Sequence, residues 1–76
     1  KHDEENQTQY METLRVYLEQ HLSATQAARE LFIHRSTFLY RLDRIKEILQ
    51  SELDDPEEIF YLELSFRLLE QEQEKE

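Results

Sequence analysis

The sequence predicts an all-α domain of four helices with a central helix-turn-helix, and three observations support this. Large apolar residues recur at spacings of three and four along most of the 76 residues. Gly is absent and Pro occurs once, so few residues interrupt a helix. Apolar residues make up 38% of the chain, which at this regular spacing favours a small folded core over disorder. The length allows one domain only.

The first helix is expected from about Thr8 to Gln20. Residues 1–9 contain no apolar side chain, so we expect them to form a flexible leader. The apolar residues that follow are spaced by three and four and are expected to share one core face, with Tyr17 beside it. These residues are Met11, Leu14, Leu18 and Leu22.

The second helix is expected from Ala24 to about Leu31, after a capping box at 23–26. In such a box the Ser23 hydroxyl accepts a hydrogen bond from the Gln26 backbone N–H, and the Gln26 side chain returns to the Ser23 N–H. Ala27 and Ala28 follow on the inner face. Two small residues in succession predict a close approach by another helix.

A short break at 32–34 contains neither Gly nor Pro, so packing of Ile33 must hold this turn. The third helix is expected from about Arg35 to Gln50. Its core face is expected to carry Phe38, Leu42, Ile45 and Leu49, widened by Ile48.

The fourth helix has a strong start signal, with Asp55 as N-cap, Pro56 at the first helical position and Glu58 completing a capping box. It is expected to end near Gln71, which makes 10–71 the folded domain and 72–76 a frayed acidic tail. This helix carries more apolar surface than a small core requires. The surplus residues are Phe60, Tyr61, Leu64 and Leu68.

Charge is distributed unevenly along the chain. The total is −9, yet the segment from Ala24 to Lys46 contains five basic and two acidic residues, a local charge of +3. The remainder therefore carries −12. The absence of Cys excludes disulfides and thiolate metal sites, and the spacing of the three His residues suits no metal. No apolar run could span a membrane, no Gly-rich phosphate loop exists, and no nucleophile–base pair is readable. We expect no cofactor and no enzyme activity.

Residues 23–42 combine a capped short helix with small inner residues, a three-residue corner and a longer helix opening with Arg-Ser-Thr, which describes a helix-turn-helix. The run ATQAARELFIHRSTFLYRLDRIKEIL resembles the C-terminal helix-turn-helix of the PucR/CdaR family of bacterial transcriptional regulators. More distantly it is similar to Fis-type domains, and the implied fold is Fis-like or homeodomain-like. The resemblance covers about Thr13 to Leu69. The family usually has Asn at the position of Ser36. Many helix-turn-helix motifs have Gly at the position of Phe32, so the Phe32 backbone must keep a negative φ or tolerate strain.

The candidate DNA-binding residues cluster around the start of the third helix. Arg35 is the best base reader, because Arg can donate two hydrogen bonds to guanine; a solvated side chain or an ion pair with Glu30 is the alternative. For the hydroxyl residues and His34, capping of a helix competes with contacts to bases or phosphate. Tyr40 and Leu39 are expected to point away from the core, with core packing as the alternative for Tyr40. The full set is Ser23, Thr25, His34, Arg35, Ser36, Thr37, Leu39, Tyr40 and Arg41.

We therefore predict sequence-specific binding of double-stranded DNA, with residues 35–50 as the recognition helix in the major groove. The resemblance implies the output domain of a bacterial, cytoplasmic regulator that acts as a homodimer, through the last helix or through a region N-terminal to this chain. The alternative is an acidic helical module for protein interaction or dimerisation that binds no DNA. Its support is the charge of −9 and the surplus apolar surface.

Overall fold

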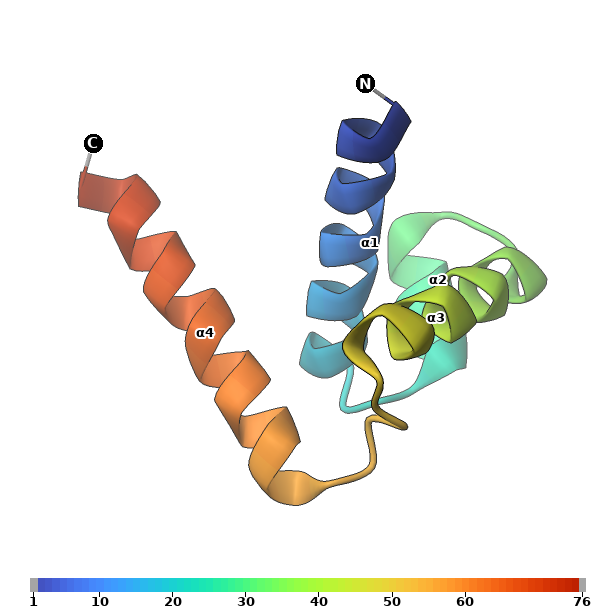
Figure 1. Ribbon diagram of the computed structural model, residues 1–76. Helices are drawn as coiled ribbons and strands as arrows, with labels where there is room; N and C mark the ends of the chain where they lie inside the picture. Colours follow the sequence, from blue (N-terminus) through green and yellow to red (C-terminus); the bar gives the residue numbers. More distant parts are fainter. Residues whose placement is uncertain (1, 76) are drawn as a thin grey trace.

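A computed structural model describes the backbone of residues 2–75 and the side chains of residues 7–72. It confirms the all-α class and the four helices. In chain order these are α1 (His2–Glu19), α2 (Ala24–Leu31), α3 (Arg35–Leu49) and α4 (Pro56–Lys75). Helix α1 lies at the centre and contacts the other three, while α2 and α3 also contact each other (Figure 1). Among the described helices, α4 contacts α1 alone.

The core forms where α1, α2 and α3 meet. Phe38 of α3 is fully buried, and its ring lies 5.6 Å from the half-buried ring of Tyr17 on α1, tilted by 46°. Ala27 and Ala28 are buried, as the close approach of helices at α2 required. Ile33 is half-buried and packs against this core at the corner. The buried apolar residues are Leu14, Val16, Leu18, Ala27, Ala28, Phe38, Leu42, Ile45 and Leu53.

The predicted core face of α1 is only half right. Leu14 and Leu18 are buried, but Met11 and Leu22 are exposed. Thr13 and Val16 are buried instead, on a side of the helix that the apolar spacing did not single out. The reason is the central position of α1, because a helix that contacts three other helices buries more than one stripe. Leu22 lies in the turn after the helix, where its φ is 65°.

The end of α3 also differs from prediction. Ile48 and Leu49 are exposed, although the spacing placed them on the core face. They would be covered if α4 packed on α3, but α4 packs on α1. Leu53 in the following connection is buried and takes part in the core.

The cap of α2 forms half of the predicted box. The Gln26 backbone N–H donates to Ser23 Oγ at 3.2 Å. The Ser23 N–H, however, donates to the Gln20 carbonyl at 3.2 Å, so it does not need the Gln26 side chain. The turn between α1 and α2 thus supplies a backbone partner that the sequence pattern could not reveal.

Helices α2 and α3 both end in a left-handed residue that is not Gly. Phe32 has φ 59° and ψ 42°, and its N–H donates back to the Arg29 carbonyl while the Ile33 N–H donates to the Ala28 carbonyl. Gln50 ends α3 in the same way, with φ 52° and ψ 48°. These are the hydrogen bonds of a Schellman cap. Of the two conformations that the sequence allowed for Phe32, the structure has the strained one, because these two bonds require a positive φ there.

The start of α4 confirms Asp55 as N-cap. Its Oδ1 accepts from the Glu57 N–H at 3.2 Å, and its carbonyl accepts from the Ile59 N–H at 2.9 Å. Glu58 does not complete a box, because its carboxylate accepts from the Ser51 hydroxyl instead. Ser51 Oγ in turn accepts from the backbone N–H of Leu53 at 2.9 Å. The carboxylate therefore ties α4 to the connection that precedes it.

The two end helices are longer than predicted. Helix α1 begins at His2 rather than near Thr8, and α4 continues to Lys75 rather than ending near Gln71. The predicted flexible leader (1–9) and frayed tail (72–76) fall partly outside the described residues, since side chains are described only for 7–72. No described helix is long and apolar enough to cross a membrane.

Candidate nucleic-acid interface

The first turn of α3 projects from the body of the domain. Arg35, Ser36 and Thr37 are all exposed, whereas Phe38, the next residue, is fully buried. The Phe38 N–H donates to the His34 carbonyl at 3.0 Å, which closes the first turn of the helix. The buried ring therefore fixes the helix in the core while the three preceding side chains face solvent.

Thr25 and Arg35 come together across the two helices of the motif. Arg35 Nε donates to Thr25 Oγ1 at 3.2 Å, and both residues are exposed. This hydrogen bond links the start of α2 to the start of α3. Arg35 forms no ion pair with Glu30 or with any other described carboxylate, so the ion-pair alternative is wrong. The alternative of a solvated side chain stays open, because Arg35 is exposed. The hydrogen bond uses Nε and leaves both terminal guanidinium nitrogens free to donate.

The other polar candidates differ in how far the helix caps occupy them. Ser23 Oγ accepts from a backbone N–H, as its capping role predicted. His34 stands at the N-cap position of α3 with extended backbone (φ −65°, ψ 149°), but its imidazole forms no capping hydrogen bond. Capping by His34 is thus ruled out. The hydroxyls of Ser36 and Thr37 form no hydrogen bond with any described residue, so they too are available to a ligand.

The second turn of α3 supplies one exposed and two half-buried candidates. Tyr40 is exposed, so the core-packing alternative does not hold for it. Arg41 is half-buried and has no ion-pair partner among the described carboxylates. Leu39 was expected to point away from the core, but it is half-buried and packs against it. The face that remains open is therefore narrower than predicted.

Charge limits this surface to the first two turns of α3. Arg44 Nη1 lies 3.4 Å from Glu47 Oε1, so this charge beyond the second turn is paired. The pKa of Arg44 is raised, first by the side chain of Tyr10 and then by the Glu47 carboxylate. Asp43 is exposed nearby. An anionic ligand would therefore meet unpaired positive charge at Arg35 and Arg41 and carboxylates beyond them.

Phe32 is a feature whose side chain the sequence analysis left without a role. Phe32 stands where many helix-turn-helix motifs have Gly. Its side chain is 94% exposed and lies two residues before His34. No signal in the sequence separates Phe32 from Ile33, because both are large apolar residues of the same corner and only Ile33 packs against the core. The left-handed backbone turns the ring outward at the corner of the motif.

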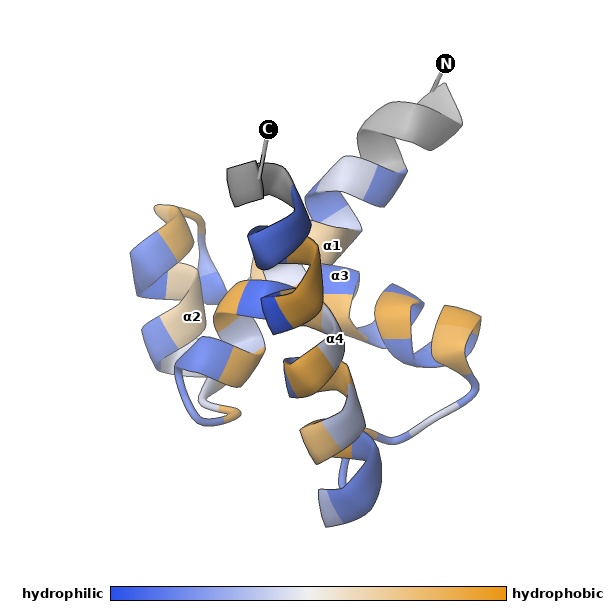
Figure 2. Cartoon of the chain, turned by 90° about the vertical axis from the view of Figure 1, so that its left-hand side faces the viewer, coloured by the Kyte–Doolittle hydropathy of each residue, from blue (hydrophilic) through white to orange (hydrophobic). Residues whose placement is uncertain are grey.

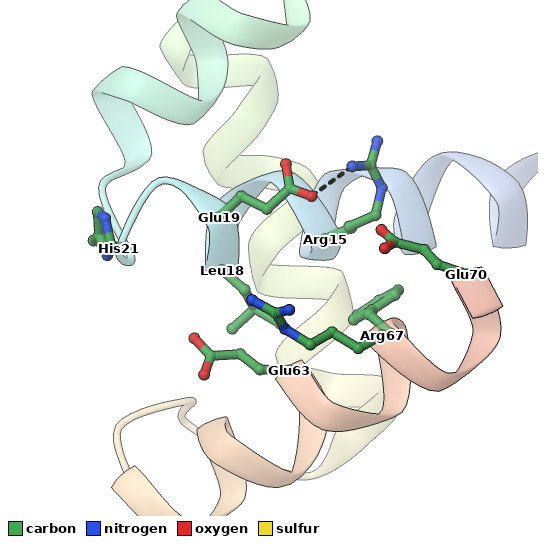
Figure 3. A pocket seen from close by; sticks show the side chains of 8 residues that line it. Arg15, Leu18, Glu19, His21, Glu63, Arg67 and Glu70 are labelled. Atoms are coloured by element: carbon green, nitrogen blue, oxygen red, sulfur yellow. Dashed lines mark hydrogen bonds and ion pairs between the residues drawn. The ribbon is translucent and has the colours of Figure 1, made fainter.

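A groove lies between α1 and α4 (Figure 3). Arg15 is held within α1, by Glu12 and Glu19 at 2.7 Å each, and its pKa is raised chiefly by Glu12. No group of three His, Asp or Glu residues within the described chain could hold a metal ion. The groove is lined by Arg15, Leu18, Glu19, His21, Glu63, Phe66, Arg67 and Glu70.

Comparisons with known proteins agree with this geometry. The family model of the PucR C-terminal helix-turn-helix domain matches residues 10–68. The purine catabolism regulatory protein of Bacillus subtilis (strain 168) is 41% identical over 58 residues, covering 76% of this chain and 11% of that protein. The proline-responsive transcriptional activator PutR of the same strain is 40% identical over 53 residues, covering 70% of this chain and 13% of PutR.

The chain thus spans a small part of the length of these relatives. Both are named as regulators of transcription or catabolism rather than as enzymes, in agreement with the expectation for this sequence. No solved structure gives a significant match.

Proposed function

Because the chain belongs to the family of the PucR C-terminal helix-turn-helix domain, we propose that it binds double-stranded DNA sequence-specifically as the output domain of a bacterial, cytoplasmic transcriptional regulator. The observation that carries this proposal is the first turn of α3. Three exposed polar side chains, Arg35, Ser36 and Thr37, stand there on a helix that Phe38 anchors in the core. A helix-turn-helix reads DNA with this part of its second helix, in the major groove.

Arg35 is the proposed base reader. Its terminal nitrogens can donate two hydrogen bonds to guanine O6 and N7, a contact that discriminates against other bases by roughly 1–3 kcal/mol. The hydrogen bond from Nε to Thr25 holds the stem of the side chain before DNA arrives. Less rotational freedom is then lost on binding, which favours affinity.

The neighbouring residues complete the proposed interface. Ser36, Thr37 and Tyr40 are exposed near Arg35, which supports their entering the major groove of DNA with it. Leu39 adds only the part of its side chain that the core leaves open. The remaining candidates lie where they could contact phosphates, which position a domain without reading sequence. These are Ser23, Thr25, His34 and Arg41.

The charge distribution predicts weak binding with a modest dependence on salt. About 3–5 phosphate contacts are available per copy, so log K should fall against log salt with a slope of roughly −3 to −4.5. Two copies on two half-sites about 34 Å apart would add their contacts. We therefore propose that the regulator acts as a homodimer, through α4 or through a region N-terminal to this chain.

Selection of bound sites from random duplexes, with two copies of the chain joined, tests the proposal. Fluorescence anisotropy on the selected site then compares Arg35→Ala with Arg44→Ala. Both changes remove one positive charge from α3, but Arg44 is paired with Glu47. We expect Arg35→Ala to lose about 5- to 150-fold in discrimination at one base position, with unchanged thermal stability. Arg44→Ala should keep its discrimination.

One outcome would reject DNA binding, and another would reject the role given to Arg35. If no duplex is selected at low salt, the result supports the alternative of an acidic protein-interaction module. The exposed apolar residues of α4 and the charge of −9 also favour that alternative. If Arg35→Ala unfolds the domain while specificity persists, the role given to Arg35 is wrong.

A further inference from the structure

Helix α4 has an apolar face that no described part of the chain covers. Phe60 and Tyr61 are 65% and 68% exposed, and Leu64 and Leu68 are exposed beside them. This set, Phe60, Tyr61, Leu64 and Leu68, is called the outer face below. Figure 2, in which α4 stands in front, shows hydrophobic residues along most of its length. An exposed apolar patch of this extent on a small domain marks an interaction site.

The spacing of the outer face indicates that its partner is another helix. Tyr61, Leu64 and Leu68 follow one another at intervals of three and four, the spacing of a helix-pairing seam. The opposite side of α4 carries a second such series, Ile59, Leu62 and Phe66, whose half-buried side chains pack against the core. A helix with two apolar seams on opposite sides can pack between two other helices. In α4, one seam packs on α1 and the other is open to a second partner helix.

We propose that the outer face binds the same face of α4 in a second copy of this chain, with the two helices antiparallel. The seam is self-complementary about Leu64, as a two-fold interface requires. An antiparallel pair centred on Leu64 brings Leu64 against Leu64 of the second copy and Phe60 against its Leu68. It also sets Glu57 opposite Gln71. A parallel pair would instead place Glu57 against the same carboxylate of the other copy, which is unfavourable in a chain of charge −9.

The location of the outer face leaves the helix-turn-helix free. Figure 1 shows α4 on one side of α1 and the α2–α3 pair on the other, so a second copy on α4 does not cover the start of α3. This pairing rests on the homodimer of the proposed function and assigns it to α4. It does not require DNA binding, so self-association and DNA binding can each fail without the other.

The area available predicts a weak dimer. With about 150–250 Å² per fully buried aromatic residue, the exposed parts of the outer face amount to roughly 400–500 Å² per copy. Pairing would bury about 800–1,000 Å², below the roughly 1,200 Å² at which stable interfaces begin. We expect a dissociation constant on the order of 100 µM for the isolated chain.

Sedimentation velocity of the 76-residue chain between about 10 µM and 1 mM tests the proposal. We expect a concentration-dependent shift from monomer to dimer, and Leu64→Glu should weaken it at least 10-fold. Leu69→Glu is the matched control, because Leu64 and Leu69 are both 44% exposed but Leu69 borders the groove toward α1. It should dimerise like the unaltered chain. Circular dichroism confirms that both variants are folded.

Disulfide cross-linking tests the orientation, since the chain has no Cys. A mixture of the Glu57→Cys and Gln71→Cys proteins should form a cross-linked heterodimer, and the Glu57→Cys protein alone should not. Strong cross-linking of the Glu57→Cys protein with itself would overturn the antiparallel arrangement. A chain that stays monomeric at 1 mM, or that dimerises equally after Leu64→Glu, would overturn the proposal and leave the outer face to another segment of a longer polypeptide.

Discussion

Thr13 offers a test of the packing around α1. The side chain is fully buried, and its hydroxyl has no hydrogen-bond partner among the described residues. A buried hydroxyl without a partner costs about 1–3 kcal/mol relative to an apolar group of the same shape. Thr13→Val replaces the hydroxyl by a methyl group of similar size and keeps the β-branched shape. We therefore expect the free energy of unfolding to rise by about 1–3 kcal/mol.

Thermal unfolding followed by circular dichroism measures this effect. For a domain of 60–100 residues, 1 kcal/mol corresponds to about 4–8 °C in Tm. Thr37→Val is the matched control, because Thr37 is also in a helix but is exposed, and its Tm should change little. An unchanged or lower Tm for Thr13→Val would refute the reasoning. It would mean that the hydroxyl has a partner in solution or that the site does not accept a methyl group.

Two further substitutions test the helix ends and the crossing of helices. Gln50→Gly should raise the free energy of unfolding by up to about 1 kcal/mol, because Gly adopts the left-handed conformation of Gln50 without strain. Gln26→Gly, inside α2, is the control and should lower the free energy of unfolding by about 1 kcal/mol. If chemical denaturation shows that both variants change the free energy of unfolding in the same direction, this account is wrong. Ala28→Leu should lower the free energy of unfolding by about 1–3 kcal/mol, because the larger side chain overfills the buried contact of α2. Glu30→Leu, on the exposed side of α2, is the control and should be nearly neutral. Equal urea unfolding midpoints for the two variants would show that the helices do not approach closely at Ala28.

Local signals predicted the helix ends and the buried anchor that position the candidate interface. The N-caps Ser23 and Asp55, the corner at 32–34 and the buried Phe38 follow from side-chain chemistry and spacing within a few residues, and the structure confirms each. The hydrogen bond between Thr25 and Arg35 could not be predicted. It joins residues ten positions apart, and only the angle between α2 and α3 decides whether they meet.

The sequence by itself determined the helices, because capping and apolar periodicity act over single turns of the chain. Which apolar residues are covered was decided by the tertiary structure alone. Helix α4 packs on α1 and not on α3, so Ile48 stays exposed although its spacing resembles that of a core residue. The central helix α1 buries Thr13, although Thr13 does not follow the apolar spacing of a core residue. Burial depends on what lies opposite a side chain, and a pattern within one helix does not contain that information.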